Sequence, residues 1–415
     1  MFNEGKLLTN IPPAPISGMA CQVTDEVRLV HWWVTGGEAA ALNVLKKNLS
    51  KEGVGYNDTP ISGGAKMMTE LQTMVATGDI PTAAVMSGYS TQDWARKGVL
   101  SDLSSLAAAG DWENVIPEAL QKFCKFNGKW IGVPLSLHSI NWLWINKVAA
   151  EKVGLKAPPA TMDELFVVLE RARSAGLVPM AIGGQPWLMA TLFDSVVMAT
   201  NGIDFYKKAF IELDAAALTS PEMTKAFQNL AKLASYTDSA YSGRNWSDAT
   251  DMVVTGQALL EVAGDWVKAE FRAAQKESDT DYMYARFPGT EDDVIFNSDI
   301  IVMFDVEPDR QAAQMKLAKA IMDPAFQSLF NDAKGAAPAR MDVSDTAFDA
   351  CGKKAIADVR AANKNGMLIG SLAHGYVQPA NIQEAYFIVV MKVFHGEIGP
   401  EAAAGALAAS IAAVR

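Results

Sequence analysis

Two adjacent tryptophans and a nearby glutamate are the residues whose types and spacing most clearly suit ligand binding. Trp32 and Trp33 end an apolar run, and Glu38 follows a Gly-Gly pair in the segment VHWWVTGGE. Neighbouring side chains of a strand point to opposite faces, so one side of a sheet cannot hold both indoles. Indole offers a flat apolar surface with an N–H at its rim, and a carboxylate accepts hydroxyl protons in bonds of about 1.5–3 kcal/mol. A sugar ring requires both, because its C–H groups form apolar faces and its hydroxyls surround the edge.

The same three side chains also have an ordinary structural interpretation. Trp32 would then belong to a core, Trp33 would lie at an interface between lobes, and Glu38 would be a favourable negative charge at the start of a helix. From the residues alone, both interpretations stay open.

Signatures of enzymes are missing from the chain. It contains no G-x-S-x-G elbow, Walker A motif, H-E-x-x-H or G-x-G-x-x-G. The four histidines, His31, His138, His374 and His395, are far apart in sequence. We therefore expect no catalytic residue, no metal and no cofactor. A carboxylate pair for glycoside hydrolysis could come from any of the 47 acidic residues, so a carbohydrate-active enzyme stays the alternative to a binding protein.

Length and charge narrow the class of protein. The chain has 415 residues, half of them hydrophobic, and a net charge of −11. Such a length predicts two domains or one large domain. The acidic balance argues against nucleic acid as a partner. Residues 1–26 have no apolar signal-peptide core and resemble a leader or tag, consistent with a removed export signal.

Strand-like and helical patterns alternate along the chain. Strand-like runs occupy 27–34, 83–87, 130–145 and 299–304. An apolar stripe predicts a helix from Glu38 to Leu49. A capping box at Thr161 predicts a helix that ends at about Ala175. Further helices are predicted to begin at Ser220, Asp323 and Pro400. The alternation predicts an α/β fold with largely parallel sheets. Ligands of such folds bind beyond the carboxyl ends of strands, where Trp32, Trp33 and Glu38 would lie.

Three segments change character and suggest passages between two lobes. They are 134–141, 288–298 and 335–350, and they would make each lobe discontinuous in sequence. The cysteines Cys21, Cys124 and Cys351 are sparse. Cys124 and Cys351 could form a disulfide or could be two buried free thiols, and the sequence leaves both alternatives open.

Several stretches together carry a resemblance to a known family. They are VHWWVTGGEAAALNVLKK, GGAKMMTELQTMVATGDIPTAAVM, WIGVPLSLHSINWLWINK, GDW at 264–266, NSD at 297–299, AKGAAPAR and SLAHGYVQP. From about residue 27, the chain resembles the extracytoplasmic sugar-binding proteins of bacterial ABC importers. Within that class it is most similar to the glucose and mannose binders.

The resemblance implies a ligand site drawn from distant segments. Glu38 and Asp299 match hydroxyl-binding carboxylates of the family, and Lys334 and His374 match a polar pair that donates to the other edge of the sugar. In the segment 87–95, relatives often carry histidine, glutamine or lysine, whereas this chain offers Tyr89 and Asp93. The predicted ligand-binding residues are Trp32, Trp33, Glu38, Tyr89, Asp93, Trp246, Trp266, Asp299, Lys334 and His374.

The resemblance also implies an architecture and a role. We expect a type II-like periplasmic binding protein with an N-terminal lobe of 27–135 plus 296–345 and a C-terminal lobe of 136–295 plus 346–415, joined by a hinge. It would capture a monosaccharide, glucose first, in the cleft and present it to a membrane permease. We expect a periplasmic or other extracytoplasmic monomer that is not an enzyme.

Overall fold

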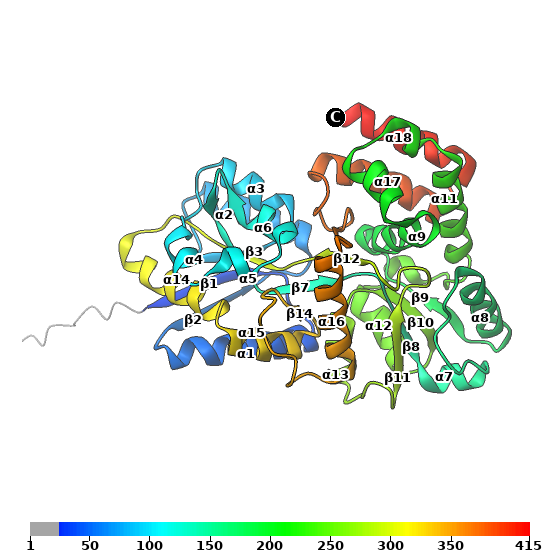
Figure 1. The fold of residues 1–415 in the computed structure, drawn as a ribbon, viewed down its shortest axis with the longest axis horizontal. Helices are drawn as coiled ribbons and strands as arrows, with labels where there is room; N and C mark the ends of the chain where they lie inside the picture. The colour runs from blue at the N-terminus through cyan, green and yellow to red at the C-terminus, as the bar shows by residue number, and fades with distance from the viewer. Residues whose placement is uncertain (1–24) are drawn as a thin grey trace, which may run out of the picture.

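The computed structural model describes residues 25–415 and consists of two α/β lobes that lie side by side (Figure 1). Each lobe has its own sheet and its own buried apolar core. We call the lobe that contains β1 (Glu26–His31) the first lobe and the lobe that contains β8 (Trp142–Asn146) the second lobe. The predicted leader, apart from its last two residues, and Cys21 lie outside the described residues.

The sheet of the first lobe mixes parallel and antiparallel strands. β1 is parallel to β2 and β3, whereas β13 is antiparallel to β3 and β6. The predicted strands 27–34, 83–87 and 299–304 are confirmed as β1, β3 and β13. In spatial order the strands are β2 (Gly55–Pro60), β1 (Glu26–His31), β3 (Ala83–Met86), β13 (Ile300–Met303) and β6 (Gly132–Pro134).

The sheet of the second lobe shows that the expectation of largely parallel sheets is wrong. Only β9 and β10 run parallel there, and β8 pairs antiparallel with both β10 and β11. Parallel pairing needs a crossover within one sheet. All four strands come from the continuous stretch 142–286, and β8 runs opposite to its neighbours β10 and β11, a direction that the alternation of elements does not reveal. The strands are β11 (Tyr282–Arg286), β8 (Trp142–Asn146), β10 (Ala258–Ala263) and β9 (Val178–Ala181).

A small sheet lies between the lobes (Figure 1). The three predicted passage segments, 134–141, 288–298 and 335–350, each contain one of its strands. The lobe boundaries that we predicted at 135, 295 and 345 stay predictions. The strands are β14 (Ala337–Pro338), β7 (Ser136–Ser139), β12 (Val294–Asn297) and β15 (Leu368–Gly370), and β4 (Lys125–Phe126) pairs separately with β5 (Lys129–Trp130).

Helices cover both cores, and their starts follow local capping rules. The side chains of Thr161, Ser220 and Asp323 each accept a hydrogen bond from a backbone N–H of the first turn, as the sequence predicted. The first core is covered by α1 (Gly36–Lys51), α2 (Gly64–Ala76), α3 (Tyr89–Arg96), α4 (Ser104–Ala109), α5 (Trp112–Val115), α6 (Glu118–Cys124), α14 (Pro308–Ile321) and α15 (Pro324–Lys334). The second core is covered by α7 (Lys147–Lys152), α8 (Met162–Ser174), α9 (Pro186–Tyr206), α10 (Ala215–Leu218), α11 (Pro221–Ala234), α12 (Trp246–Val254), α13 (Val267–Ala273), α17 (Ala380–Phe394) and α18 (Pro400–Val414), with a π-helix at Lys207–Ile211 and a 3-10 turn at Tyr241–Gly243.

Helix α16 (Ala350–Asn365) joins the two cores. Its Cys351 packs in the second core, whereas its Ile356 and Val359 pack in the first. Cys124 belongs to the first core. Cys124 and Cys351 are both buried free thiols, so the bridge that the sequence left open does not form. Within residues 25–415, no helix combines the length and the apolar character needed to cross a membrane.

Gly88 marks a close approach between the β3–α3 turn and the loop before α17. It has φ +51°, and a Cβ there would lie 2.1 Å from the carbonyl oxygen of Gly375. We expect Gly88→Ala to lower the free energy of unfolding by about 2–5 kcal/mol, because left-handed strain and steric overlap add. Urea unfolding measures this loss.

Gly98 supplies the matched control. It has φ +70°, but a Cβ there meets nothing within 4 Å. Gly98→Ala should therefore cost only the backbone strain, about 1–2 kcal/mol. Equal losses for the two variants would contradict the close approach at Gly375.

Candidate functional site

Charged side chains of alternating sign form a buried chain where the lobes meet. The Lys334 Nζ lies 3.6 Å from Glu38 Oε1 and 3.7 Å from Asp299 Oδ2. On the other side of Asp299, His138 Nε2 lies 3.4 Å from the same Oδ2, and His138 Nδ1 lies 2.5 Å from Asp265 Oδ1. None of these five side chains is more than 9% exposed. Three of them, Glu38, Asp299 and Lys334, were predicted from the sequence.

The ends of secondary-structure elements position these charges. Glu38 lies in the first turn of α1, Lys334 is the last residue of α15, and Asp299 lies between β12 and β13. His138 comes from β7 of the small sheet, and Asp265 follows β10. The positive end of the dipole of α1 favours a negative charge at Glu38.

Glu38 has the role at a helix start that one interpretation of the sequence gave it, and it also faces a buried lysine. Its Oε2 accepts hydrogen bonds from the backbone N–H groups of Val34 and Thr35, which completes a capping box with Thr35. Its Oε1 faces the ammonium of Lys334. One carboxylate therefore both starts the helix and belongs to the buried charge chain.

Trp33 lies against this chain of charges. Its side chain contacts His31 and Phe330, with ring centroids at 5.4 and 6.1 Å, and the Lys334 Nζ lies 5.4 Å from its ring centroid. The indole N–H is buried and has no well-formed hydrogen bond. It nevertheless lies near enough to Asp299 to help lower the pKa of that carboxyl. Trp33 is thus a buried residue of the first core, not of a lobe interface, and its indole N–H lies beside a carboxylate.

The charges of Asp299 and His138 depend on one another. Burial alone would raise the pKa of Asp299, but Lys334 and His138 outweigh it and hold that pKa below its ordinary value. Burial alone would lower the pKa of His138, but Asp265 and Asp299 outweigh it and raise that pKa to about 8. At neutral pH, Asp299 is therefore a carboxylate and His138 is mostly an imidazolium.

Aromatic rings form the other wall of the site. Trp266 lies next to His138, Trp187 and His374, with ring centroids at 5.6, 5.9 and 5.7 Å. Trp187 and His374 are 5.7 Å apart. Burial, with a smaller contribution from the charge of His138, lowers the pKa of His374 to about 3, so this imidazole is neutral. Of the predicted residues, Trp266 thus contacts His138 of the charge chain directly, and His374 is connected to it through Trp266.

The other predicted residues lie outside this group. Asp93 is on the outer face of α3, where it pairs with Arg96 at 2.5 Å and its side chain is 46% exposed. Trp32 is half-buried against the first core, and Trp246 is half-buried at the start of α12 against the second. The ring of Tyr89 packs on Phe123. Its backbone N–H, however, donates to Gly375, next to His374.

Sequence reasoning missed three members of the group: His138, Asp265 and Trp187. A signal existed for His138, because a lone histidine interrupts an apolar run in PLSLHSIN. Asp265 directly precedes the predicted Trp266. Trp187 stands in a Gly- and Pro-containing segment without any distinguishing pattern.

Several buried polar atoms near the charge chain lack a hydrogen-bond partner in the part of the chain that the structure describes. They include Trp33 Nε1, Asp299 Oδ2 and Asn297 Oδ1, and Asn297 lies opposite His138 in the small sheet. An unsatisfied buried polar group costs about 1–3 kcal/mol. Donors and acceptors of this kind, beside aromatic faces, suit a ligand that offers both hydroxyls and apolar C–H surface.

A group of His, Cys, Asp and Glu that could hold a metal ion is not found among residues 25–415.

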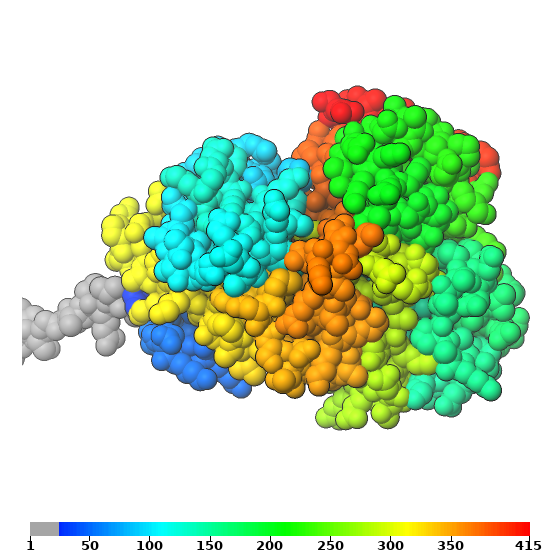
Figure 2. Space-filling model, viewed as in Figure 1, coloured from blue at the N-terminus to red at the C-terminus, as the bar shows by residue number. Residues whose placement is uncertain are grey.

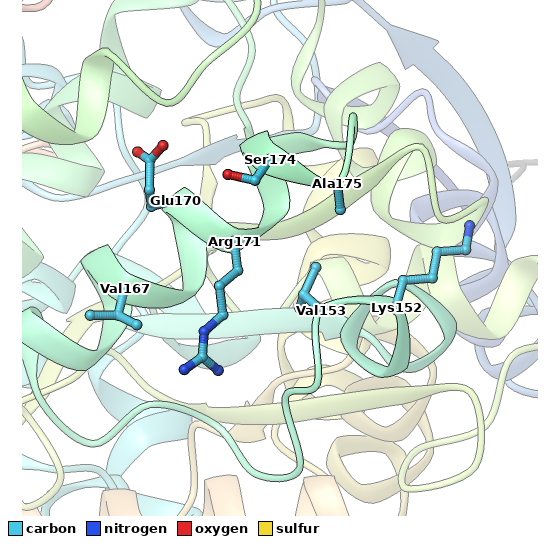
Figure 3. Close-up of a pocket in the computed structure, with 7 residues that line it drawn as sticks. All are labelled: Lys152, Val153, Val167, Glu170, Arg171, Ser174 and Ala175. Atoms are coloured by element: carbon cyan, nitrogen blue, oxygen red, sulfur yellow. The ribbon is translucent and has the colours of Figure 1, made fainter.

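A separate surface pocket lies at the outer edge of the second lobe. It is formed by α7 and α8, and Lys152, Val153, Glu170 and Arg171 are among its lining residues (Figure 3). None of the predicted site residues lines it. A notch also separates the lobes on the face shown in Figure 2, with residues in blue and cyan on one side and residues in orange, green and red on the other.

Known proteins of similar sequence match nearly the whole chain. A probable sugar-binding periplasmic protein of Mesorhizobium japonicum is 52% identical over 397 residues, which cover 95% of each chain. Another protein of that description, from Brucella suis, is 48% identical over 408 residues, which cover 97% of this chain and 96% of the relative.

Solved structures match the fold. A chitin oligosaccharide binding protein aligns with a TM-score of 0.78 at 20% identity, over 94% of this chain and 98% of that one. The two-lobe architecture predicted from the sequence is confirmed. The model of the family described as bacterial extracellular solute-binding protein matches residues 36–323. Because this match covers most of the chain, and relatives are about half identical along nearly all of it, the protein belongs to the bacterial extracellular solute-binding protein family.

Proposed function

We propose that this protein captures an uncharged monosaccharide, glucose first among them, between its lobes and presents it to the membrane permease of an ABC importer. The observation that carries the proposal is the buried group of aromatic faces and unsatisfied polar atoms around Asp299. As a member of an extracellular family, the protein acts outside the cytoplasm. The name of the Mesorhizobium relative supports the periplasm and a sugar ligand.

Both lobes contribute to the proposed site. Trp33, Glu38, Asp299 and Lys334 belong to the first lobe, and the ring group around Trp266 belongs to the second. A sugar that contacts both lobes favours their closure only to the extent that it binds the closed arrangement better. The permease would then recognise the closed shape. The lobe boundaries predicted from the sequence form part of this proposal.

One bridge between the lobes needs no ligand. Glu270 of α13 accepts hydrogen bonds from the Thr35 hydroxyl at 2.7 Å and from the Gly37 backbone N–H at 3.1 Å, at the start of α1. This contact lies directly beside Glu38. It joins the two lobes in the absence of a sugar.

The expected affinity is compatible with such a site. A hexose has roughly 12 heavy atoms, and micromolar binding needs about −8 kcal/mol. That is about −0.7 kcal/mol per atom, which is within the range for small ligands. The hydrolase alternative finds no support at Asp299, because a general acid needs a raised pKa and this pKa is lowered.

The site assignment predicts the effect of two substitutions. Trp33→Ala and Asp299→Asn should abolish sugar binding, because they remove a ring face and the carboxylate that accepts hydroxyls. A thermal-shift panel of common monosaccharides, followed by calorimetry, measures this; at a hundredfold excess over Kd the wild type should gain about 2.7 kcal/mol of stability.

Asp93→Asn is the matched control, because Asp93 is an exposed carboxylate outside the group. It should bind as the wild type does. Full sugar binding by Asp299→Asn would defeat the site assignment. A wild type that binds none of the common sugars would defeat the proposed function itself.

The raised pKa of His138 predicts a pH dependence of stability. Its pKa is about 8 in the folded chain against an ordinary 6.5, so its contribution is fully present below about pH 6.5 and is lost as the pH rises through 8. The shift corresponds to roughly 2 kcal/mol. Urea unfolding of wild type and His138→Gln at pH 6 and pH 9 isolates this residue from other titrating groups. The stability difference between them should be smaller at pH 9 by about that amount; a constant difference would argue against a charged His138.

A further inference from the structure

A buried carboxylate of the second lobe holds the loop that carries His374. Asp194 of α9 is fully buried, and its Oδ2 accepts hydrogen bonds from the Ser371 hydroxyl at 2.7 Å and from the Ala373 backbone N–H at 3.1 Å. Its Oδ1 is 2.8 Å from the Tyr386 hydroxyl. The loop is therefore anchored on both sides of Leu372, immediately before His374.

The hydrogen bonds of Ser371 determine which ring nitrogen of His374 carries the proton. The Ser371 Oγ lies 2.9 Å from His374 Nδ1 and also accepts the His374 backbone N–H at 3.2 Å. A serine hydroxyl has one proton to donate. Asp194 Oδ2 already accepts a backbone N–H, so Oδ2 is an acceptor and receives the Ser371 proton. Toward His374, the Ser371 oxygen can then only accept, and Nδ1 must be the protonated nitrogen.

The remaining nitrogen of His374 is free for a ligand. A neutral imidazole with its proton on Nδ1 has a lone pair on Nε2. Among residues 25–415, no side chain or backbone group makes a hydrogen bond with this Nε2. The ring lies against Trp187 and Trp266, which form the aromatic wall of the proposed site.

We propose that Asp194 and Ser371 are positioning residues that fix His374 in the Nδ1–H tautomer, so that its Nε2 accepts a hydrogen bond from a sugar hydroxyl. The consequence for binding rests on the proposed function. It differs from the donor role that the family resemblance implied for His374. Lys334 is then the donor of that pair, whereas Asp299 and His374 both accept.

This arrangement narrows the class of ligand. A hydroxyl can donate to Nε2, whereas a carboxylate or phosphate oxygen would face a lone pair with no proton between them. The site therefore favours a neutral sugar, with a free hydroxyl at the position next to His374, over a uronic acid or a sugar phosphate that places its anionic group there.

The tautomer can be measured without any ligand. Two-dimensional ¹H–¹⁵N spectra of histidine-labelled protein at pH 7 distinguish the two ring nitrogens by their ¹⁵N shifts and coupling patterns. We expect a protonated Nδ1 and an unprotonated Nε2 for His374 in the wild type. The Nε2–H tautomer in the wild type would overturn the proposal, whatever the variants show.

Three variants test the role of Ser371. Ser371→Ala removes the acceptor and should release the ring to the Nε2–H tautomer, and Ser371→Thr, which keeps a hydroxyl, should restore Nδ1–H. Ser195→Ala is the matched control, because Ser195 is a buried serine of α9, next to Asp194, whose hydroxyl donates to the backbone carbonyl of Thr191 and does not contact His374. An unchanged tautomer in Ser371→Ala would contradict the positioning role.

Calorimetry with deoxy sugars tests the consequence for binding. Ser371→Ala should weaken binding of the parent monosaccharide about tenfold. It should leave unchanged the affinity for the monodeoxy analogue that lacks the hydroxyl bound by Nε2. An equal loss for every analogue would contradict the acceptor role. If the wild type binds no sugar, the proposed function fails while the tautomer result still stands; if sugar binds but the wild-type tautomer is Nε2–H, only this inference fails.

Discussion

The arrangement of the lobes depends on a buried carboxylate that has to stay ionised. Asp299 is 6% exposed, and burial of an isolated charge is too costly unless partners compensate it. Its partners are the ammonium at the end of α15 and the imidazolium of β7, which is itself held by Asp265. These groups lie far apart in sequence, and removing one partner of a buried pair costs about 3–5 kcal/mol. The fold must therefore bring Asp299 and its charged partners together where the two lobes meet.

Several side chains at this junction serve the fold and the proposed site together. Glu38 caps α1 with one oxygen and faces Lys334 with the other. Trp33 packs on Phe330 of α15 and keeps an unused N–H beside Asp299. Because the same atoms have both functions, a loss of sugar binding has to be compared with a loss of stability in each variant. The tautomer of His374 is valuable for this reason, since packing alone does not determine it.

Local patterns in the sequence predicted the helices well and the sheets poorly. Helix starts at Thr161, Ser220 and Asp323 depend on hydrogen bonds within one turn, which neighbouring residues determine. The run 130–145 passes from the first lobe to the second, so it forms separate strands of different sheets, although the sequence shows one continuous strand-like run there. The candidate site shows the same difference between what neighbouring residues determine and what distant contacts determine. Residues within recognisable motifs, such as Trp33 and Asp299, were named from the sequence, and the structure brings both next to Lys334. Their partners His138, Asp265 and Trp187 are defined by contacts distant in sequence. Asp93 stands where the chain departs from the family pattern, and it lies on the solvent side of α3.

The central claim is that one sugar joins the two lobes at Asp299. A crystal structure of the protein grown with its tightest-binding monosaccharide tests this claim most directly. The account predicts hydroxyls bonded to Asp299 and Lys334, with a ring face on Trp33 or Trp266 and one hydroxyl at His374 Nε2. A sugar bound elsewhere, such as in the α7–α8 surface pocket, or between the lobes without any contact to Asp299, would contradict it.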